Sequence, residues 1–448
     1  MSIEKSVAPA ADAIARHCIH TVEVGAVDTY GHLRGKRVPA QRFLDTVAKG
    51  GVNIADAIYV FDMQCEIVDS PVINMGTGYL DMHLTPDLAS LRILTHRPGY
   101  AIVLSDAFDE HGNRHQLDPR GVLQRQIDRC AALGYDPIVA TELECYICLP
   151  DWAPFQSHVQ YSSLTDALPL EAIVADMRAA LLGAGIPVES SNPEYGPGQL
   201  EINFGPADPL RTADNTVLFK SIVKQVAVQH GVRATFMPKP ISGQSGSGMH
   251  IHTSLDRDGV NQFGQDADGM PNTLMANWTA GMVTHAPAMS LIGIPLPNGY
   301  RRVRPYTFCP THAHWGEDNR TVMARLTTSQ GKANRVEFRC AGADANPYLA
   351  IAAVLAAGCD GLERSLPLPP KAVGDMYTEP GDSPELPTSM QVALDLFSAS
   401  PLASQLGEVF SQNFVVLGNY ELALAHEAMA GDADIVTEWE RQRYLEHT

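Results

Sequence analysis

Acidic side chains interrupt stretches of this sequence that otherwise predict buried β-strands. In ATELECYICL, residues 140–149, Glu142 and Glu144 alternate with apolar residues, so a strand places both carboxylates on one face. Glu201 stands inside the apolar run of GQLEINF, residues 198–204. An unpaired carboxylate buried in a core costs several kcal/mol, so each acid needs either solvent, a salt bridge or a ligand.

Two further stretches share this design. GSGMHIHTSL, residues 246–255, puts His250 and His252 on one strand face, and NRVEFRC, residues 334–340, does the same for Arg335, Glu337 and Arg339. A solvated face or a satisfied salt bridge explains any one stretch. Four together predict a single sheet with helices behind it and a polar, ligand-lined face in front.

The acids and one histidine of this face suggest a metal centre. The set comprises five carboxylates and one imidazole: Glu142, Glu144, Glu194, Glu201, Glu337 and His250. Five carboxylates repel one another unless cations are held among them, and two divalent ions supply nearly the required charge. Oxygen-rich ligands with one imidazole favour Mg²⁺ or Mn²⁺ over zinc.

Basic residues gather in one short part of this acidic chain. Between positions 298 and 339 the sequence contains Arg301, Arg302, Arg304, Arg320, Arg325, Lys332, Arg335 and Arg339. This concentration indicates an anionic ligand, and beside Mg²⁺ that ligand suggests phosphate chemistry. Neither a GxxxxGK[ST] loop nor a dinucleotide-binding glycine fingerprint occurs, so the sequence does not indicate a P-loop kinase or a Rossmann enzyme.

Composition sets broader limits. With 448 residues, of which 45% are hydrophobic, the chain is long enough for a large core and more than one domain. A net charge of −19 argues against binding to nucleic acid or an anionic membrane. The sequence has no apolar run long enough for a membrane helix and no signal-peptide pattern, so we expect a soluble, cytoplasmic protein.

The pattern of predicted secondary structure changes near residue 116. Before it, short strand and turn patterns predict a small β-rich domain, residues 1–115; after it, strands alternate with helices in a second domain, residues 116–448. Asp118 and Pro119 form a typical helix start, with Gly134 at the end. Residues 212–231 and 346–366 also predict helices, the latter mostly buried.

These motifs resemble the glutamine synthetase family through nearly the whole chain. The matching segments are ELE, EYGPGQLEINF, ATFMPKP followed by GSGMHIHTSL, NGYRRVRP, DNRTVMARL and NRVEFRCAGADANPYLA, in the family's order. The resemblance implies an α+β fold: an N-terminal β-grasp domain and a catalytic domain with a curved antiparallel sheet backed by helices. It also implies a homo-oligomer, a dodecamer of two hexameric rings, with each active site between neighbouring subunits.

Residue by residue, the resemblance implies a two-metal site. Glu144, Glu194 and Glu201 would surround one ion, and Glu142, His250 and Glu337 the other. Glutamate or its activated carboxylate would bind at Arg302, Arg320 and Arg339 with the loop of Ser245 and Gly246. ATP would lie beside His252, Arg325, Lys332 and Arg335. Family members use ATP to convert the γ-carboxylate of glutamate into an acyl phosphate, which an amine then displaces.

Departures from the family pattern concern the amine. Ammonia-using members carry a glutamate in the flap where this chain has Phe308, and a phenyl ring removes a charge that favours ammonium. We therefore expect a γ-glutamyl–amine ligase acting on a polyamine, ethanolamine or a short alkylamine. Asp62, in a longer N-terminal loop that lacks the usual DGSS, is a candidate for holding ammonium. Ser245 replaces the usual Asn.

Other functions are also compatible with the sequence. The chain resembles ammonia-using glutamine synthetases in most of its motifs, guanidino phosphotransferases share the catalytic fold, and a non-catalytic descendant is conceivable. The alternative interpretation of Phe308 is that it only packs within an ordered flap. Tyr377 lies near the position where some bacterial members are adenylylated, although an ordinary exposed tyrosine is the simpler interpretation.

Overall fold

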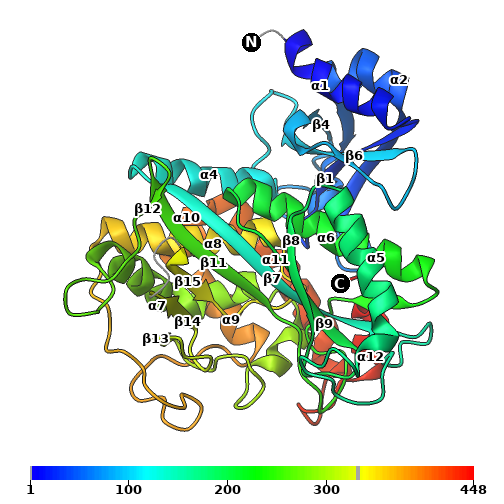
Figure 1. The fold of residues 1–448 in the computed structure, drawn as a ribbon. Coiled ribbons are helices and arrows are strands. Elements are labelled where there is room, and N and C mark those ends of the chain that lie inside the picture. Colours follow the sequence, from blue (N-terminus) through cyan, green and yellow to red (C-terminus); the bar gives the residue numbers. More distant parts are fainter. Residues whose placement is uncertain (1–2, 329–332) are drawn as a thin grey trace.

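A computed structural model describes residues 3–328 and 333–448 of the chain. An N-terminal β-sheet region lies above a larger region of strands and helices (Figure 1). This arrangement confirms the predicted α+β class, with a β-rich region first and a sheet backed by helices after it. Lys332 lies outside the described residues.

The N-terminal sheet has the strand order β2-β1-β6-β4-β3, with β5 paired to β6. Its strands are β1 (Thr21–Val27), β2 (Leu33–Pro39), β3 (Val52–Ala55), β4 (Asp81–Pro86), β5 (Arg92–Ile93) and β6 (Tyr100–Phe108). The β1–β6 pair is parallel and the others are antiparallel. The apolar side chains of Val22, Val24, Phe43 and Val103 form its small core.

Helical turns accompany this sheet. They are α1 (Ile3–Arg16), α2 (Ala40–Arg42), the π-helical turn Phe43–Val47, α3 (Ala48–Gly50) and the 3₁₀ turns Asp56–Val60 and Leu88–Ser90. Helix α1 was not predicted, although Val7, Ala10 and Ile14 recur at helical spacing and are buried.

The large sheet runs in the order β13-β14-β15-β11-β7-β9-β8, with β10 on β7 and β12 on β11. Its strands are β7 (Asp136–Cys148), β8 (Val188–Pro193), β9 (Gln199–Phe204), β10 (Arg233–Thr235), β11 (Met249–Arg257), β12 (Val260–Asn261), β13 (Trp315–Glu317), β14 (Ala324–Thr327) and β15 (Arg335–Phe338). All four strands predicted from the charged motifs are present.

One prediction about this sheet was wrong: it is mixed, not antiparallel. Strands β13 and β14 pair in parallel, with Trp315 opposite Ala324. The connection of residues 318–323 returns the chain to the start of β13, so β14 leaves in the same direction. The remaining pairs are antiparallel.

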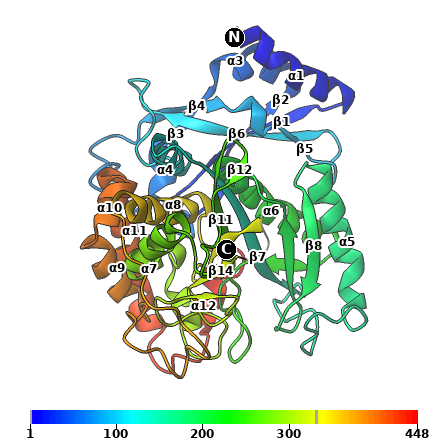
Figure 2. The ribbon, with the colours of Figure 1, turned by 60° about the vertical axis from the view of Figure 1, so that its left-hand side comes forward.

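Helices pack on the strands of the large sheet and on one another (Figure 2). The helices are α4 (Pro119–Ala132), α5 (Leu168–Gly183), α6 (Pro209–Gln229), α7 (Thr273–Gly293), α8 (Pro347–Glu363), α9 (Met390–Ser398), α10 (Pro401–Leu406), α11 (Glu408–Ala428) and α12 (Glu438–Tyr444), with a 3₁₀ turn at Pro297–Arg302. Asp118 caps α4 by accepting the N–H of Arg120 at 3.2 Å, as the sequence predicted. Among the described residues, no helix combines the length and apolarity needed to cross a membrane.

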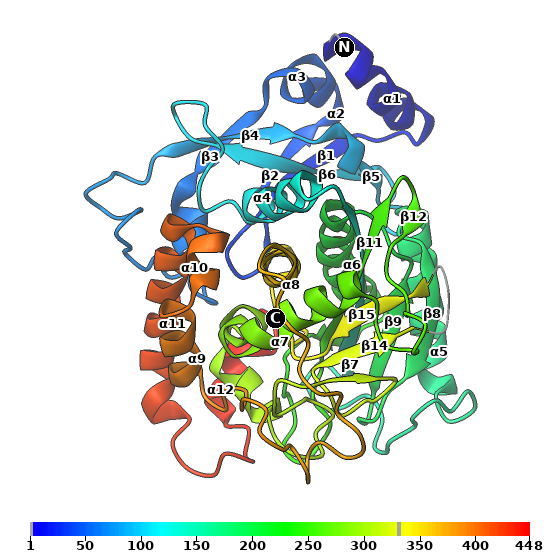
Figure 3. The same ribbon diagram turned by 90° about the vertical axis from the view of Figure 1, so that its left-hand side faces the viewer.

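Helix α8 lies at the centre of the helical layer, between α4, α6, α7 and α10 (Figure 3). Glycines allow its close approach to α7. A Cβ at Gly281 would lie 2.0 Å from the carbonyl oxygen of Ala357, and one at Gly361 would lie 2.1 Å from that of Asn277. The core is therefore packed tightly behind the sheet, and the polar strand face points away from it.

A buried ion cluster joins the two regions of the chain. Arg120 of α4 donates to Asp87 at 2.9 Å and to Asp106 at 3.0 Å in the N-terminal region, and also contacts Asp214 of α6. The hydroxyl of Tyr348 in α8 donates to Asp214 at 2.6 Å. Because Arg120 is only 1% exposed, its charge depends on these partners.

Candidate active site

The strand register brings the predicted acids and histidines together. In the antiparallel pair β7–β11, Glu142 lies opposite His250. On the other edge of β7, Glu144 lies opposite Glu201 of β9. In β11–β15, His252 lies opposite Glu337. Since side chains alternate along a strand, these groups all project from one face of the sheet.

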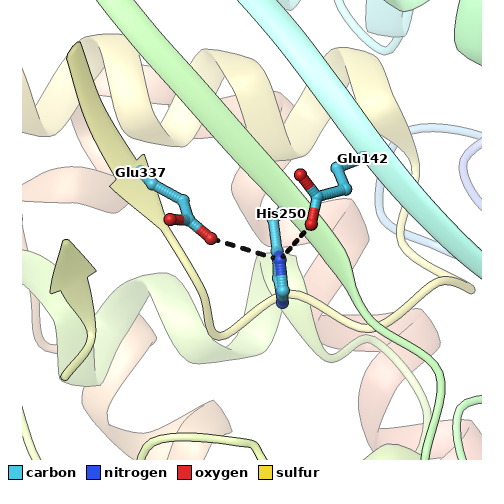
Figure 4. Close-up of side chains that lie close together, drawn as sticks. All are labelled: Glu142, His250 and Glu337. Atoms are coloured by element: carbon cyan, nitrogen blue, oxygen red, sulfur yellow. Dashed lines mark hydrogen bonds and ion pairs between the residues drawn. The ribbon is translucent and has the colours of Figure 1, made fainter. Parts of the chain in front are cut away.

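Glu142, His250 and Glu337 form the first of two clusters, here called the His250 cluster. One side-chain ligand atom from each lies within 4.8 Å of the others. Nδ1 of His250 is 3.1 Å from Oε1 of Glu142 and 3.2 Å from Oε1 of Glu337, and both carboxylates point toward the imidazole (Figure 4). The three residues come from three adjacent strands.

Positive groups favour the ionised form of the acids in this cluster. Burial by itself raises the pKa of Glu142, but hydrogen bonds with His250 and His252 outweigh it and lower that pKa overall. For Glu337, burial is likewise outweighed by His252 and Arg339, which lower its pKa to about 2. Both carboxylates are therefore charged at neutral pH.

The second cluster, the Glu201 cluster, consists of Glu144, Glu194 and Glu201, again with ligand atoms within 4.8 Å of one another. Glu144 accepts the N–H of Gly248 at 2.6 Å. Burial and the neighbouring Glu194 raise the pKa of Glu144 to about 7. Burial and the surrounding acids raise that of Glu201 to about 10. These carboxylates have too little positive charge near them.

Both clusters fit hard divalent cations. Five carboxylates and one imidazole converge from the sheet and its edge, which is the donor chemistry that suits Mg²⁺ or Mn²⁺. Two amide side chains steady the acids of the Glu201 cluster. Asn192 donates to Glu194 at 2.8 Å, and Asn203 donates to Glu201 at 3.0 Å.

Two predicted arginines lie beside these clusters with donors to spare. Arg339 donates through Nη1 to Glu337, and Arg302 donates to the carbonyl of Cys340 at 3.5 Å. Both are almost fully buried. The Nε of each is buried and makes no hydrogen bond to the described residues. These donors lie where an anion would satisfy them.

The remaining predicted arginines hold different positions. Arg325 bridges Glu337 at 2.9 Å and Asp318 at 2.5 Å. Arg320 is exposed, and its charge helps to lower the pKa of Glu194, which burial raises. The structure therefore places Arg320 near the Glu201 cluster and Arg325 at the His250 cluster.

The loop of Ser245 and Gly246 is fixed between the clusters and Arg302. The carbonyl of Ser245 accepts the hydroxyl of Tyr146 at 2.7 Å, and that of Gly246 accepts the amide of Gln199 at 3.0 Å. A Cβ on Gly246 would lie 2.6 Å from Cγ of Arg302. Glycine at this position lets the arginine lie against the loop backbone.

A cavity of about 500 Å³ opens beside the His250 cluster. It is lined by residues of β7, β8, β9, β11 and β15, among them Glu142, Asn203, His252 and Arg335. Nε of Arg335 donates to Nδ1 of His252 at 3.2 Å. The volume suits a small molecule of nucleotide size, with a cationic group at its wall.

The flap of residues 303–312 presents Phe308 at the surface. Phe308 is 53% exposed and has a left-handed backbone, φ +65°. Its ring lies edge-on to Tyr195, with centroids 5.2 Å apart. The next residue, Cys309, is buried, and burial raises its thiol pKa while Arg302, Arg339 and Glu144 act on it as nearby charges. The buried side of the flap therefore lies near Arg302, Arg339 and Glu144.

Tyr195 is a site residue that sequence reasoning missed. It lies within the motif EYGPGQ, directly after Glu194, and its backbone N–H donates to that carboxylate at 3.2 Å. The available signal was an aromatic residue directly after the predicted ligand Glu194.

Two further predictions concern Asp62 and Tyr377. Asp62 is 2% exposed, and Arg443 of α12 donates to it at 2.7 Å, so in this chain the acid already has a cationic partner. Its ammonium role stays a prediction.

Tyr377 is not an ordinary exposed tyrosine: its hydroxyl is buried, and its ring packs on Tyr306 with centroids 5.3 Å apart.

The chain is similar to known proteins of one family. The model of the family described as "Glutamine synthetase, catalytic domain" matches residues 116–444. The chain is 34% identical to glutamate–isopropylamine ligase of a Pseudomonas species, covering 99% of this chain and 98% of that protein. It is 34% identical to gamma-glutamylethanolamide synthetase of Streptomyces coelicolor, covering 97% and 94%.

A glutamine synthetase from Thermus thermophilus is 35% identical, over 82% of this chain and 85% of that protein. Among solved structures, a complex of GmaS with ADP superposes with a TM-score of 0.84 at 28% identity, covering 96% of this chain and 98% of that one. The two amine-ligase relatives match nearly the full chain.

Proposed function

Because this chain belongs to the glutamine synthetase family, we propose that it is an ATP-dependent ligase that joins the γ-carboxylate of glutamate to an amine. The observation that carries the proposal is the convergence of two three-residue clusters beside a nucleotide-sized cavity and two buried arginines. The cluster residues come from four strands of one sheet and from the turn after β8. The near-full-length similarity to two amine ligases supports an amine as the second substrate.

We assign one divalent ion to each cluster. Glu144, Glu194 and Glu201 would hold the first, and Glu142, His250 and Glu337 the second. The ions, when bound, supply Lewis-acid neutralisation of phosphate charge. The raised pKa values of Glu144 and Glu201 support this assignment, because a cation is what these crowded acids lack.

The substrates follow from the surrounding charges. ATP would occupy the cavity beside His252 and Arg335, with Arg325 and Lys332 on the phosphate side. Glutamate would bind at the loop of Ser245 and Gly246, with Arg302, Arg320 and Arg339 receiving its carboxylates. The unpartnered Nε atoms of Arg302 and Arg339 support an anion at this place.

The reaction requires an activated carboxylate, because a carboxylate and an amine do not condense in water. An oxygen of the γ-carboxylate attacks the γ-phosphorus of ATP, ADP leaves, and an acyl phosphate forms. The amine nitrogen then forms a bond to the acyl carbon, the carbon–oxygen bond to phosphate breaks, and one proton leaves the nitrogen. Arg339 would stabilise charge on the acyl phosphate; its planar guanidinium beside Glu337 supports this role.

An ammonia-using glutamine synthetase is the second candidate, supported by the 35% identity to the Thermus thermophilus enzyme. Phe308 favours the amine instead, because a phenyl ring contributes apolar contact and no charge to attract ammonium. A guanidino phosphotransferase would release a phosphorylated product rather than inorganic phosphate. The arginines at the predicted glutamate site also argue for a ligase.

We also propose the family's double-ring dodecamer, with Asp62 of one subunit approaching the active site of its neighbour. The resemblance of the N-terminal region and motifs to the family supports this assembly. A mass near twelve times 48.5 kDa, measured in dilute solution, would support it, and a monomer would contradict it.

The test of the function combines glutamate, ATP and Mg²⁺ with one nucleophile at a time: isopropylamine, ethanolamine, putrescine or ammonium. Inorganic phosphate and the mass of the γ-glutamyl product are measured together. We expect equal amounts of phosphate and γ-glutamylamide with at least one amine. A phosphorylated product without phosphate release, or no turnover with any nucleophile, would refute a ligase.

A further inference from the structure

Three aromatic side chains form a row on the surface beside the acidic face. Tyr161, Tyr195 and Phe308 come from the loop after β7, the turn between β8 and β9, and the flap. The centroids of Tyr161 and Tyr195 are 5.9 Å apart, and those of Tyr195 and Phe308 are 5.2 Å apart. We call these three residues the aromatic row.

The row is apolar surface that the fold itself does not cover. Tyr161 is 54% exposed, Tyr195 51% and Phe308 53%. Both ring pairs are edge-to-face, which stabilises the row but leaves about half of each side chain open. Adjacent exposed rings from three separate segments are typical of a surface that binds a ligand.

Tyr195, the middle ring of the row, lies at the Glu201 cluster. The backbone of Tyr195 binds the carboxylate of Glu194, so this ring begins where that cluster ends. On the flap, Phe308 precedes Cys309. Burial raises the pKa of the Cys309 thiol, and the nearby charges of Arg302 and Glu144 also shift it. A molecule that reaches the acidic face along this side therefore passes the rings of Tyr195 and Phe308.

We propose that Tyr195 is a specificity-determining residue, which together with Phe308 forms an apolar wall for the carbon chain of a primary monoamine. This inference rests on the proposed ligase function and names the substrate class of the same site. The nitrogen would point toward the acyl phosphate, and the alkyl carbons would lie against the two rings.

The chemistry of the row selects among amines. Phenyl and phenol rings are uncharged, so they reward apolar carbon and offer no carboxylate to a second ammonium group at the far end of a diamine. A short alkylamine therefore fits better than ammonium, which has no carbon, or putrescine, whose distal charge loses solvation.

The experiment compares kcat/KM for n-propylamine and for ammonium in the intact enzyme. The variants are Tyr195→Ala, Tyr195→Phe, Phe308→Ala and the double alanine variant. Tyr306→Ala is the matched control. Like Phe308, Tyr306 is an exposed flap residue with a left-handed backbone, but its ring packs on Tyr377 and not on Tyr195. Thermal unfolding of each variant checks that the exposed substitutions leave the fold intact.

We expect Tyr195→Ala to lower kcat/KM for n-propylamine by about ten- to a hundredfold, while that for ammonium changes less than about threefold. Tyr195→Phe retains the wall and should keep the wild-type preference. Because the two rings touch, the double variant should lose less than the product of the single losses. Tyr306→Ala should leave the preference unchanged.

The outcomes separate this inference from the proposed function. If wild type releases phosphate with n-propylamine and Tyr195→Ala keeps the wild-type ratio, the wall is refuted and the ligase stands. Equal losses with both nucleophiles would assign the Tyr195 side chain a general role in the active site and also refute the wall. If wild type releases no phosphate with any amine or ammonium, the proposed function fails.

Discussion

Glu144 on β7 and Glu201 on β9 are direct register partners across two antiparallel strands. Like charges at such positions repel, and here both side chains are largely buried and joined by Glu194. A fold that keeps three acids in this arrangement sacrifices stability for a site.

Glu201→Gln should stabilise the metal-free protein by about 1–3 kcal/mol, because it removes one buried acid from a cluster of three. The same change should abolish turnover and the rise in melting temperature that Mg²⁺ causes. Thermal unfolding with and without Mg²⁺ measures both effects. Glu171→Gln, on the exposed face of α5, is the control and should alter neither. Full activity in excess chelator would contradict the metal assignment.

Arg339→Lys should lower kcat/KM for glutamate at least about tenfold, although it keeps the charge. Lysine lacks the planar fork, and a charge-assisted hydrogen bond contributes roughly 1.5–3 kcal/mol. Steady-state kinetics with saturating ATP and amine give the value. Arg364→Lys, at the exposed end of α8, should have no effect. An unchanged kcat/KM in Arg339→Lys would remove this residue from the site.

Arg335→Ala should weaken ADP binding by about 10- to 100-fold, because it removes a cation from the wall of the nucleotide-sized cavity. Calorimetric titration with ADP and Mg²⁺ measures the dissociation constant directly. Arg257→Ala removes an arginine that stacks on Tyr135 at the outer end of β11 and serves as the control. Equal ADP affinity in wild type and Arg335→Ala would place the nucleotide elsewhere.

Arg120→Met should cost about 3–5 kcal/mol of stability, because Asp214 and Asp106 lose a buried counter-charge. Denaturant unfolding provides the free energy. Arg178→Met breaks a half-exposed pair with Glu171 and should cost less than about 1 kcal/mol. If both variants were equally stable, the cluster of Arg120 would not join the two regions as described.

The sequence predicted the acidic strands well because a charged residue inside an apolar run has few physical explanations. Glu142, Glu144, Glu201 and Glu337 each stand in a strand that the structure confirms, and helix α4 begins at its predicted cap. Local patterns determine these features, so no knowledge of distant contacts was needed.

Features that depend on distant contacts were missed. The parallel pairing of β13 with β14 follows from how a loop returns, which strand patterns do not encode. Tyr195 pairs with Phe308 across more than a hundred positions, so neither ring revealed the other in the sequence. The buried hydroxyl of Tyr377 likewise results from packing against the flap.

The most direct test of the central claim is the ratio of kcat/KM for the best amine to that for ammonium, in wild type and in Phe308→Glu. We predict that wild type prefers the amine, because Phe308 offers apolar contact and no counter-charge. Phe308→Glu should shift the ratio toward ammonium by about 5- to 150-fold, since the carboxylate favours NH₄⁺ and the lost contact is worth about 1–3 kcal/mol. A wild-type enzyme that prefers ammonium outright would contradict the amine ligase and favour a glutamine synthetase.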